Sequence, residues 1–206
     1  MHPRLKRCFE FGQLANIFFL LFAFCAYVYY WSISRHGLVL VPLEIAAYTI
    51  EVVGFIFMAL SLLNFHKIVR HRYIMKTAML IYLLTEAVIM VLDFNAYKIS
   101  WYQSGSVVLN IGHAIFSGLI CFTYLALEPK NTALEIALII AEVIILAGMF
   151  GIVFGAHVYV TLFTNSIAYV VFFGIMRFLL AQERIMIDCH GDRAREAKFR
   201  SDLFDE

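Results

Sequence analysis

Two nearly identical apolar phrases in the chain each carry a pair of glutamates seven residues apart. The phrase PLEIAAYTIEVVG contains Glu44 and Glu51, and the phrase ALEIALIIAEVII contains Glu135 and Glu142. Seven residues is close to two turns of an α-helix, so the two carboxylates of each phrase share one helix face. Carboxyl groups in such surroundings can take up protons or bind cations, and these four are the first candidates for a functional site.

Further polar residues in the apolar segments extend this candidate site. Glu86 and Asp93 repeat the seven-residue spacing in a third segment, His113 follows Asn110 in a fourth, and Asn165 lies in the last. We assign a role in substrate binding or proton coupling to Glu51, Glu142, Glu86, His113 and Asn110. A secondary role is assigned to Glu44, Glu135, Asp93 and Asn165.

The composition indicates a protein embedded in a membrane. Of the 206 residues, 63% are hydrophobic and only 15% are charged, whereas a soluble domain carries about a quarter charged residues. The lipid bilayer is therefore the predicted solvent and first partner of the chain. The net charge of +1 provides no overall field that would favour nucleic acid.

Six stretches are long and apolar enough to cross a bilayer as helices, for which about 20 residues are needed. They are residues 13–34, 41–65, 74–95, 106–127, 133–154 and 157–180. Lys and Arg gather before the first stretch, between the second and third, between the fourth and fifth, and after the sixth, which places both termini in the cytoplasm. The sequence thus predicts an all-α integral membrane protein with six transmembrane helices. A cytoplasmic or interfacial segment (1–12) precedes the six-helix domain (13–180), and a charged cytoplasmic tail (181–206) follows it.

The doubled phrase also indicates an internal repeat. The second stretch matches the fifth. Weaker matches relate the first stretch to the fourth and the third to the sixth, so the two halves would be residues 13–95 and 106–180. Because three is odd, the second half would have inverted topology, as in many secondary transporters. The alternative is that apolar helices, which use few residue types, resemble each other by chance.

The depth of each carboxylate decides how it is interpreted. A charged group at the bilayer centre costs about 2.5–3.5 kcal/mol, so it faces the protein interior, a partner or water. For Glu51, Glu86 and Glu142, predicted to lie deep, we favour a function over hydrogen bonding between helices. Near the interfaces, snorkelling explains Glu44 and Glu135, and likewise Asp93. A His with two or three Glu also suits a divalent metal, so metal binding stays open, and no cofactor is assigned.

Three functions fit these observations. The favoured one is a small transporter in the cell membrane, proton-coupled and carrying a cation or small amine. The alternatives are a sensor that binds a small ligand and signals through the charged tail, or an accessory subunit of a membrane complex. Homo-oligomers or a partner protein fit any of the three. The chain contains none of the motifs GxSxG, HExxH, CxxCH or a phosphate-binding glycine loop, so an enzyme is disfavoured.

Overall fold

The structure, a computed structural model, describes residues 3–68, 73–94, 115, 132–153 and 158–181, and in these residues it is entirely helical. The helices are α1 (Pro3–His36), α2 (Val41–Ile68), α3 (Tyr73–Phe94), α5 (Thr132–Val153) and α6 (Val158–Ala181). The predicted stretches at 41–65, 74–95, 133–154 and 157–180 each agree with one of these helices to within a few residues. The predicted fourth stretch, 106–127, lies outside the described residues except for Ile115.

Among the described residues, three helices are long and apolar enough to cross a membrane. They are α1, α2 and α6, over Arg4–His36, Val41–His66 and Val160–Ala181. The apolar parts of α3 and α5 are shorter, at Thr77–Val91 and Ile136–Gly148. The all-α class is confirmed, and the described part of the chain contains three candidate membrane-spanning helices. Six spans and an inverted repeat stay predictions.

The first helix is longer than its predicted span because the N-terminal segment continues it. Leu5, Cys8 and Phe9, in its first turns, are fully buried in an apolar core shared with α2 and α6. The hydroxyl of Ser61 on α2 donates a hydrogen bond of 2.7 Å to the carbonyl of Cys8. The apolar side chains of this segment therefore pack inside the protein.

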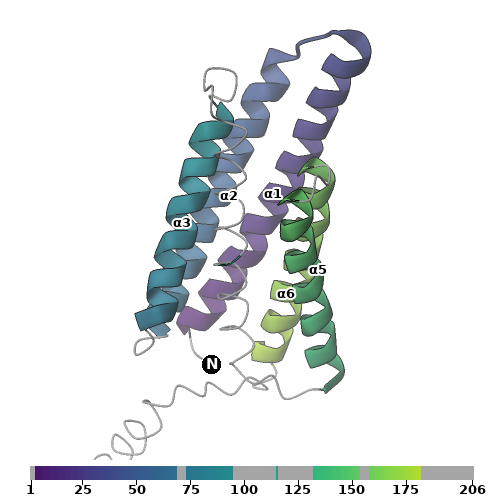
Figure 1. The fold of residues 1–206 in the computed structure, drawn as a ribbon. Helices are drawn as coiled ribbons and strands as arrows, with labels where there is room; N and C mark the ends of the chain where they lie inside the picture. The colour runs from purple at the N-terminus through teal and green to yellow at the C-terminus, as the bar shows by residue number, and fades with distance from the viewer. Residues whose placement is uncertain (1–2, 69–72, 95–114, 116–131, 154–157, 182–206) are drawn as a thin grey trace, which may run out of the picture.

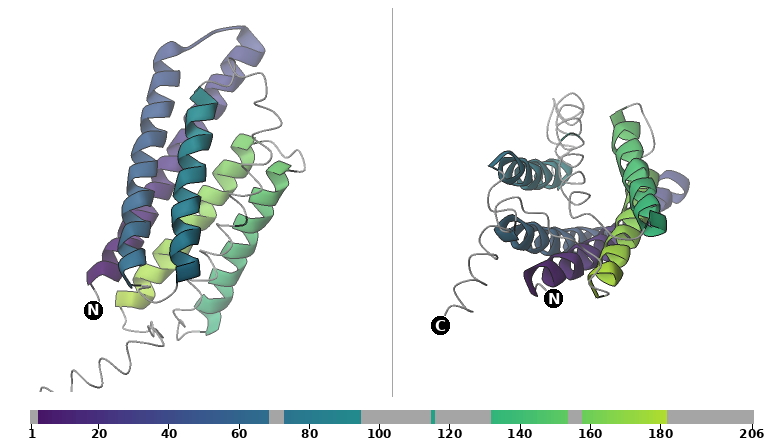
Figure 2. Two further views of the ribbon diagram at one scale, coloured as in Figure 1. Left: turned by 60° about the vertical axis from the view of Figure 1, so that its left-hand side comes forward. Right: turned by 90° about the horizontal axis from the view of Figure 1, so that it is seen from below.

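Helix α1 is the central element of the described fold, because it packs along both α2 and α6 (Figures 1 and 2). Helix α5 packs along α6, and α3 makes a smaller contact with α2. The turn from α1 to α2 uses Gly37 at a φ of 64°, and its N–H donates to the carbonyl of Ile33 at 2.9 Å. This left-handed glycine cap ends α1. Helix α1 begins and α6 ends at the opposite end of the bundle.

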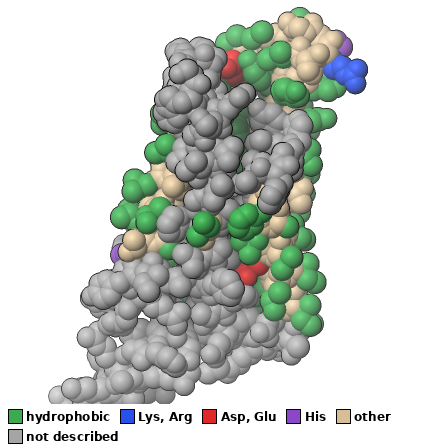
Figure 3. Space-filling view, in the orientation of Figure 1, with side chains coloured by type: hydrophobic (Ala, Val, Ile, Leu, Met, Phe, Trp, Pro, Cys, Tyr) green, Lys and Arg blue, Asp and Glu red, His purple; other side chains and the backbone are tan. Residues whose placement is uncertain are grey.

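Buried residues recur along these helices at alternating spacings of three and four, the pattern of helices that pack in a nearly aligned way. On α2 the row consists of Ala47, Glu51, Gly54, Met58, Ser61 and Phe65, and Leu62 is buried beside it. We call this row the α1–α2 seam, because Gly54 lies against Phe19 of α1 and Ser61 bonds Cys8. Many large hydrophobic side chains are exposed on the described helices, and several of them are visible in green on the face in Figure 3. Such a surface suits contact with lipid.

Candidate functional site

Glu51 is one of the buried positions in the α1–α2 seam. It lies in the first half of α2 and its exposed fraction is only 7%. One turn further along, Gly54 would place a Cβ 3.1 Å from the ring of Phe19, so the helices are close at this level. A carboxyl group thus occupies one position in the row of buried side chains that joins two candidate membrane-spanning helices.

Glu142 holds a comparable position near the middle of α5, and it is also 7% exposed. It shares a helix face with Leu138 and Ile145, both fully buried, and Ile145 packs against Ala168 of α6. The oxygen Oε1 of Glu142 is buried and has no hydrogen-bond partner among the described residues. Leaving a buried polar atom unsatisfied costs about 1–3 kcal/mol, so this oxygen is a candidate ligand atom.

Asn165 provides a second buried oxygen in the contact between α5 and α6. Its side-chain amide lies directly on the backbone of Gly148, where an added Cβ would be 2.8 Å from the amide carbon and closer still to Oδ1. That Oδ1 atom is likewise buried and unbonded within the described part of the chain. Glycine at position 148 is what leaves space for the amide.

The residues predicted to lie nearer the membrane surfaces are less buried or lie at helix ends. Glu44, in the first turn of α2, accepts a hydrogen bond of 3.0 Å from the hydroxyl of Tyr29 on α1. Glu86, which the sequence predicts to lie deep like Glu51 and Glu142, is only half-buried on α3. Glu135 is in the first turn of α5, and Asp93 is in the last turn of α3. Glu44 is thereby explained as a tether between the first two helices.

The structure brings some of these residues together and separates others. Glu142 and Asn165 lie in the same α5–α6 contact, whereas Glu51 lies in the α1–α2 seam. Helices α2 and α5 are not among the pairs that pack extensively in the described residues, so a common centre for the two buried glutamates stays a prediction. His113 and Asn110 lie outside the described residues. Within the described ranges, no three His, Cys, Asp or Glu side chains are grouped as a metal site.

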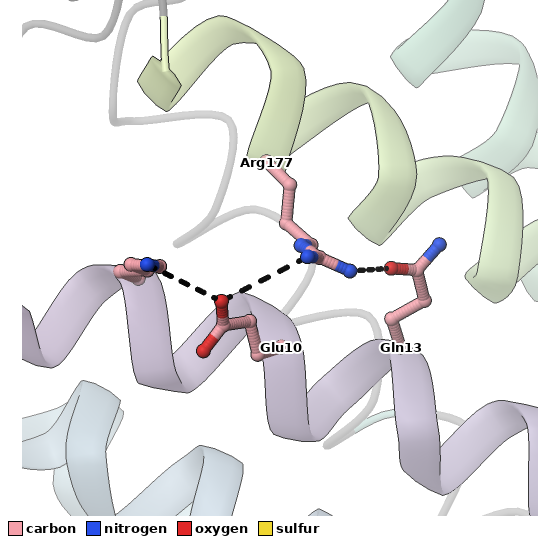
Figure 4. Close-up of polar contacts among 4 residues, drawn as sticks. Glu10, Gln13 and Arg177 are labelled. Atoms are coloured by element: carbon pink, nitrogen blue, oxygen red, sulfur yellow. Dashed lines mark hydrogen bonds and ion pairs between the residues drawn. The ribbon is translucent and has the colours of Figure 1, made fainter.

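A separate pocket of about 410 Å³, lined by both charged and apolar residues, opens where α1 begins and α6 ends. Figure 4 shows its polar contacts, in which Glu10 lies between the side chains of Lys6 and Arg177. Arg177 also donates a hydrogen bond from Nη1 to Oε1 of Gln13. The full lining consists of Lys6, Glu10, Gln13, Gly174, Arg177, Phe178, Leu180 and Ala181.

Sequence reasoning did not find this pocket. It used Lys6 and Arg177 only to orient the protein in the membrane, and it singled out neither Glu10 nor Gln13. Two signals were present: Lys6 and Glu10 are four residues apart on one helix, and Arg177 lies before the apolar end of the sixth stretch, FLLA. Their meeting depends on the packing of α1 against α6, which a single sequence does not display.

The fold and these sites define an all-helical protein with helices suited to a lipid bilayer and with carboxyl groups buried between them. Comparison with known protein families, with curated proteins and with solved structures finds no match for the chain. The function is therefore argued from the buried groups themselves.

Proposed function

We propose that this protein is a small multi-pass membrane carrier that moves a cation or a small protonated amine, coupled to proton movement. The observation that carries the proposal is Glu142, whose carboxyl group is buried near the middle of an apolar helix with one oxygen unbonded in the described part of the chain. Keeping a charged carboxylate at that depth would cost about 2.5–3.5 kcal/mol. A bound proton or a bound cation removes the cost, so the two ligands can compete for one group.

The chemistry of the neighbouring groups favours a positively charged cargo. The second unbonded atom in the α5–α6 contact, Oδ1 of Asn165, is also an oxygen. Amide and carboxylate oxygens accept hydrogen bonds and coordinate cations. An anion would instead need donors, such as Lys or Arg, and neither residue type occurs between Thr132 and Val153 on α5.

Glu51 is proposed as the second coupling group. It is as buried as Glu142, and it lies in the matching position of the doubled phrase. In the proposed arrangement, six spans form two inverted halves with both termini cytoplasmic, and each half contributes one of these glutamates. Glu86, with His113 and Asn110, would complete the proton path. Alternating access of the two glutamates from either side of the membrane would then couple proton and cargo movement.

The test is flux into proteoliposomes that contain the purified protein. A proton gradient is imposed, an internal dye reports pH, and monovalent, divalent and organic cations are added in turn to wild type, Glu142→Gln and Glu51→Gln. Glutamine keeps the size of the side chain but cannot carry the proton. Glu44→Gln is the matched control, because Glu44 lies in the first turn of α2 and accepts a hydrogen bond from Tyr29.

We expect proton movement that depends on one class of cation, lost in Glu142→Gln and Glu51→Gln and retained in Glu44→Gln. If no cation moves protons while every variant elutes as a folded species, the carrier proposal is wrong and a sensor or an accessory subunit becomes the better account.

A second comparison isolates the α5–α6 contact. Asn165→Leu removes the buried amide oxygen, and Thr164→Val changes the exposed neighbour, whose hydroxyl only bonds the carbonyl of Val160 at 2.9 Å. The affinity for the cargo should fall in Asn165→Leu alone. Equal affinity in both variants would remove Asn165 from the site.

A further inference from the structure

The pocket between the start of α1 and the end of α6 carries more positive than negative charge. Lys6 Nζ and Arg177 Nη2 each lie 3.8 Å from the same Glu10 oxygen, so a single carboxylate faces two cations. At 3.8 Å these contacts are ion pairs rather than close hydrogen bonds. Both basic side chains remain about half exposed. The excess charge is therefore open to an added anion.

The other wall of the pocket is apolar. Phe178 lines it and is 52% exposed, and Leu180 and Ala181 complete the end of α6. The pocket lies at one end of two candidate membrane-spanning helices, α1 and α6. At such an end, polar groups meet lipid headgroups while the exposed aromatic ring meets the upper part of the acyl chains.

We propose that this pocket binds the phosphate group of an anionic phospholipid. Lys6 and Arg177 would contact the phosphate oxygens, and Phe178 would pack against the glycerol and first methylene groups. Arg177 is suited to this role because a guanidinium offers five donors in a fixed plane and can bond two oxygens of one phosphate. The proposal does not depend on carrier activity, because no residue of the pocket belongs to the proposed transport site.

In this proposal, Glu10 limits the affinity of the pocket for an anionic lipid. Its carboxylate lies between the two cations and competes with an incoming phosphate, so a lipid must offset that competition to bind. Replacing it with glutamine leaves both cations free for the ligand. We therefore expect Glu10→Gln to raise the affinity for anionic lipid about fivefold, and Lys6→Gln to lower it about fivefold, the effect expected for one basic residue near an anionic membrane surface.

The experiment counts lipids bound to the full-length protein by native mass spectrometry in detergent. The probes are phosphatidylglycerol, which is anionic, and phosphatidylcholine, which has the same phosphate beside a cation. Wild type is compared with Lys6→Gln, Arg177→Gln and Glu10→Gln. Arg7→Gln is the matched control, because it removes the same charge one residue from Lys6 but outside the pocket lining.

Preferential binding of phosphatidylglycerol that falls in Lys6→Gln and Arg177→Gln, rises in Glu10→Gln and is unchanged in Arg7→Gln would support the site. An equal fall in Arg7→Gln and Lys6→Gln would overturn it in favour of a diffuse surface charge. Lys6 is exposed, so its variant keeps the test valid even if Arg177→Gln does not fold.

Added glycerol 3-phosphate separates the lipid from a soluble phosphate ester. The lipid proposal requires that millimolar glycerol 3-phosphate leave bound phosphatidylglycerol in place, and that Phe178→Ala reduce lipid binding. If the soluble ester displaces the lipid fully and Phe178→Ala has no effect, the pocket recognises phosphate alone and the lipid proposal is wrong.

Discussion

Replacing Gly12 with alanine should destabilise the contact between α1 and α6. A Cβ at position 12 would lie 2.5, 2.6 and 2.8 Å from three ring atoms of Phe173, whereas ordinary contacts begin near 3.4 Å. The ring would have to move by about 0.9 Å (3.4 minus 2.5 Å). Phe173 is fully buried and in contact with the rings of Phe9, Tyr169 and Phe172, so it has little space into which to move.

Two opposing effects set the size of the change. Overpacking a well-filled core costs about 1–3 kcal/mol. Alanine in place of glycine inside a helix recovers about 0.5–1 kcal/mol. Because neighbouring rings hold Phe173, we expect the net loss in the upper part of the range, about 1–2.5 kcal/mol. For a chain of this length that corresponds to a fall in Tm of about 3–8 °C.

The matched control is Gly174→Ala on the other side of the same interface. Its nearest new neighbour would be the Nε2 atom of Gln13 at 3.3 Å, the end of a flexible side chain. Here the gain in helix propensity dominates, and Tm should rise by about 1–4 °C. Thermal unfolding in one detergent gives both shifts. A rise in Tm for Gly12→Ala would refute the packing argument, and Phe173→Leu added to Gly12→Ala should restore part of the loss.

Two further substitutions test other close contacts. Gly148→Ala should displace the amide of Asn165 and weaken cargo binding in the proteoliposome assay, and unchanged affinity would show that the position of this amide is irrelevant. Ser61→Ala removes the hydrogen bond to Cys8 in the α1–α2 seam and should lower the free energy of unfolding by about 0.5–1.5 kcal/mol. Thermal unfolding measures this loss, with Ser34→Ala, at an exposed serine, as the control. Equal Tm values for the two variants would contradict the prediction.

The apolar stretches of the sequence predict most of the helices in the described fold. Helix α5 begins at Thr132, one residue before the stretch predicted at 133–154. The start of helix α1 is harder to predict, because the charged residues before position 13 mark the edge of an apolar span. They continue the helix, since its apolar residues Leu5 and Phe9 find partners in the protein core.

The candidate site was predicted only in part. The high cost of a carboxylate in lipid predicts that Glu51 and Glu142 face inward, and both are buried. Which helix each one faces is decided by packing between distant segments, for which one sequence gives no rule. The pocket at Glu10 and Arg177 shows the same limit, because its residues are more than 160 positions apart.

The proposed role of Glu142 depends on the helix face that the residue occupies, and exchanging Glu142 with its neighbour Val143 tests this directly. Val143 is 59% exposed on α5, beside Ile136, Ile139 and Ile140 on a broadly exposed apolar surface. The double variant Glu142→Val with Val143→Glu keeps composition and depth almost unchanged but turns the carboxyl group outward.

If lipid covers that surface, the swap should cost about 2.5–3.5 kcal/mol and sharply reduce the yield of folded protein in membranes. Glu142→Val alone removes the carboxyl group without exposing it to lipid, so this control should fold. A fully folded swap variant would mean that water or a polar partner covers the face of α5 that carries Val143. In that case, burial between α5 and α6 would no longer distinguish Glu142 from its neighbours. The result would weaken the carrier proposal and favour an accessory subunit.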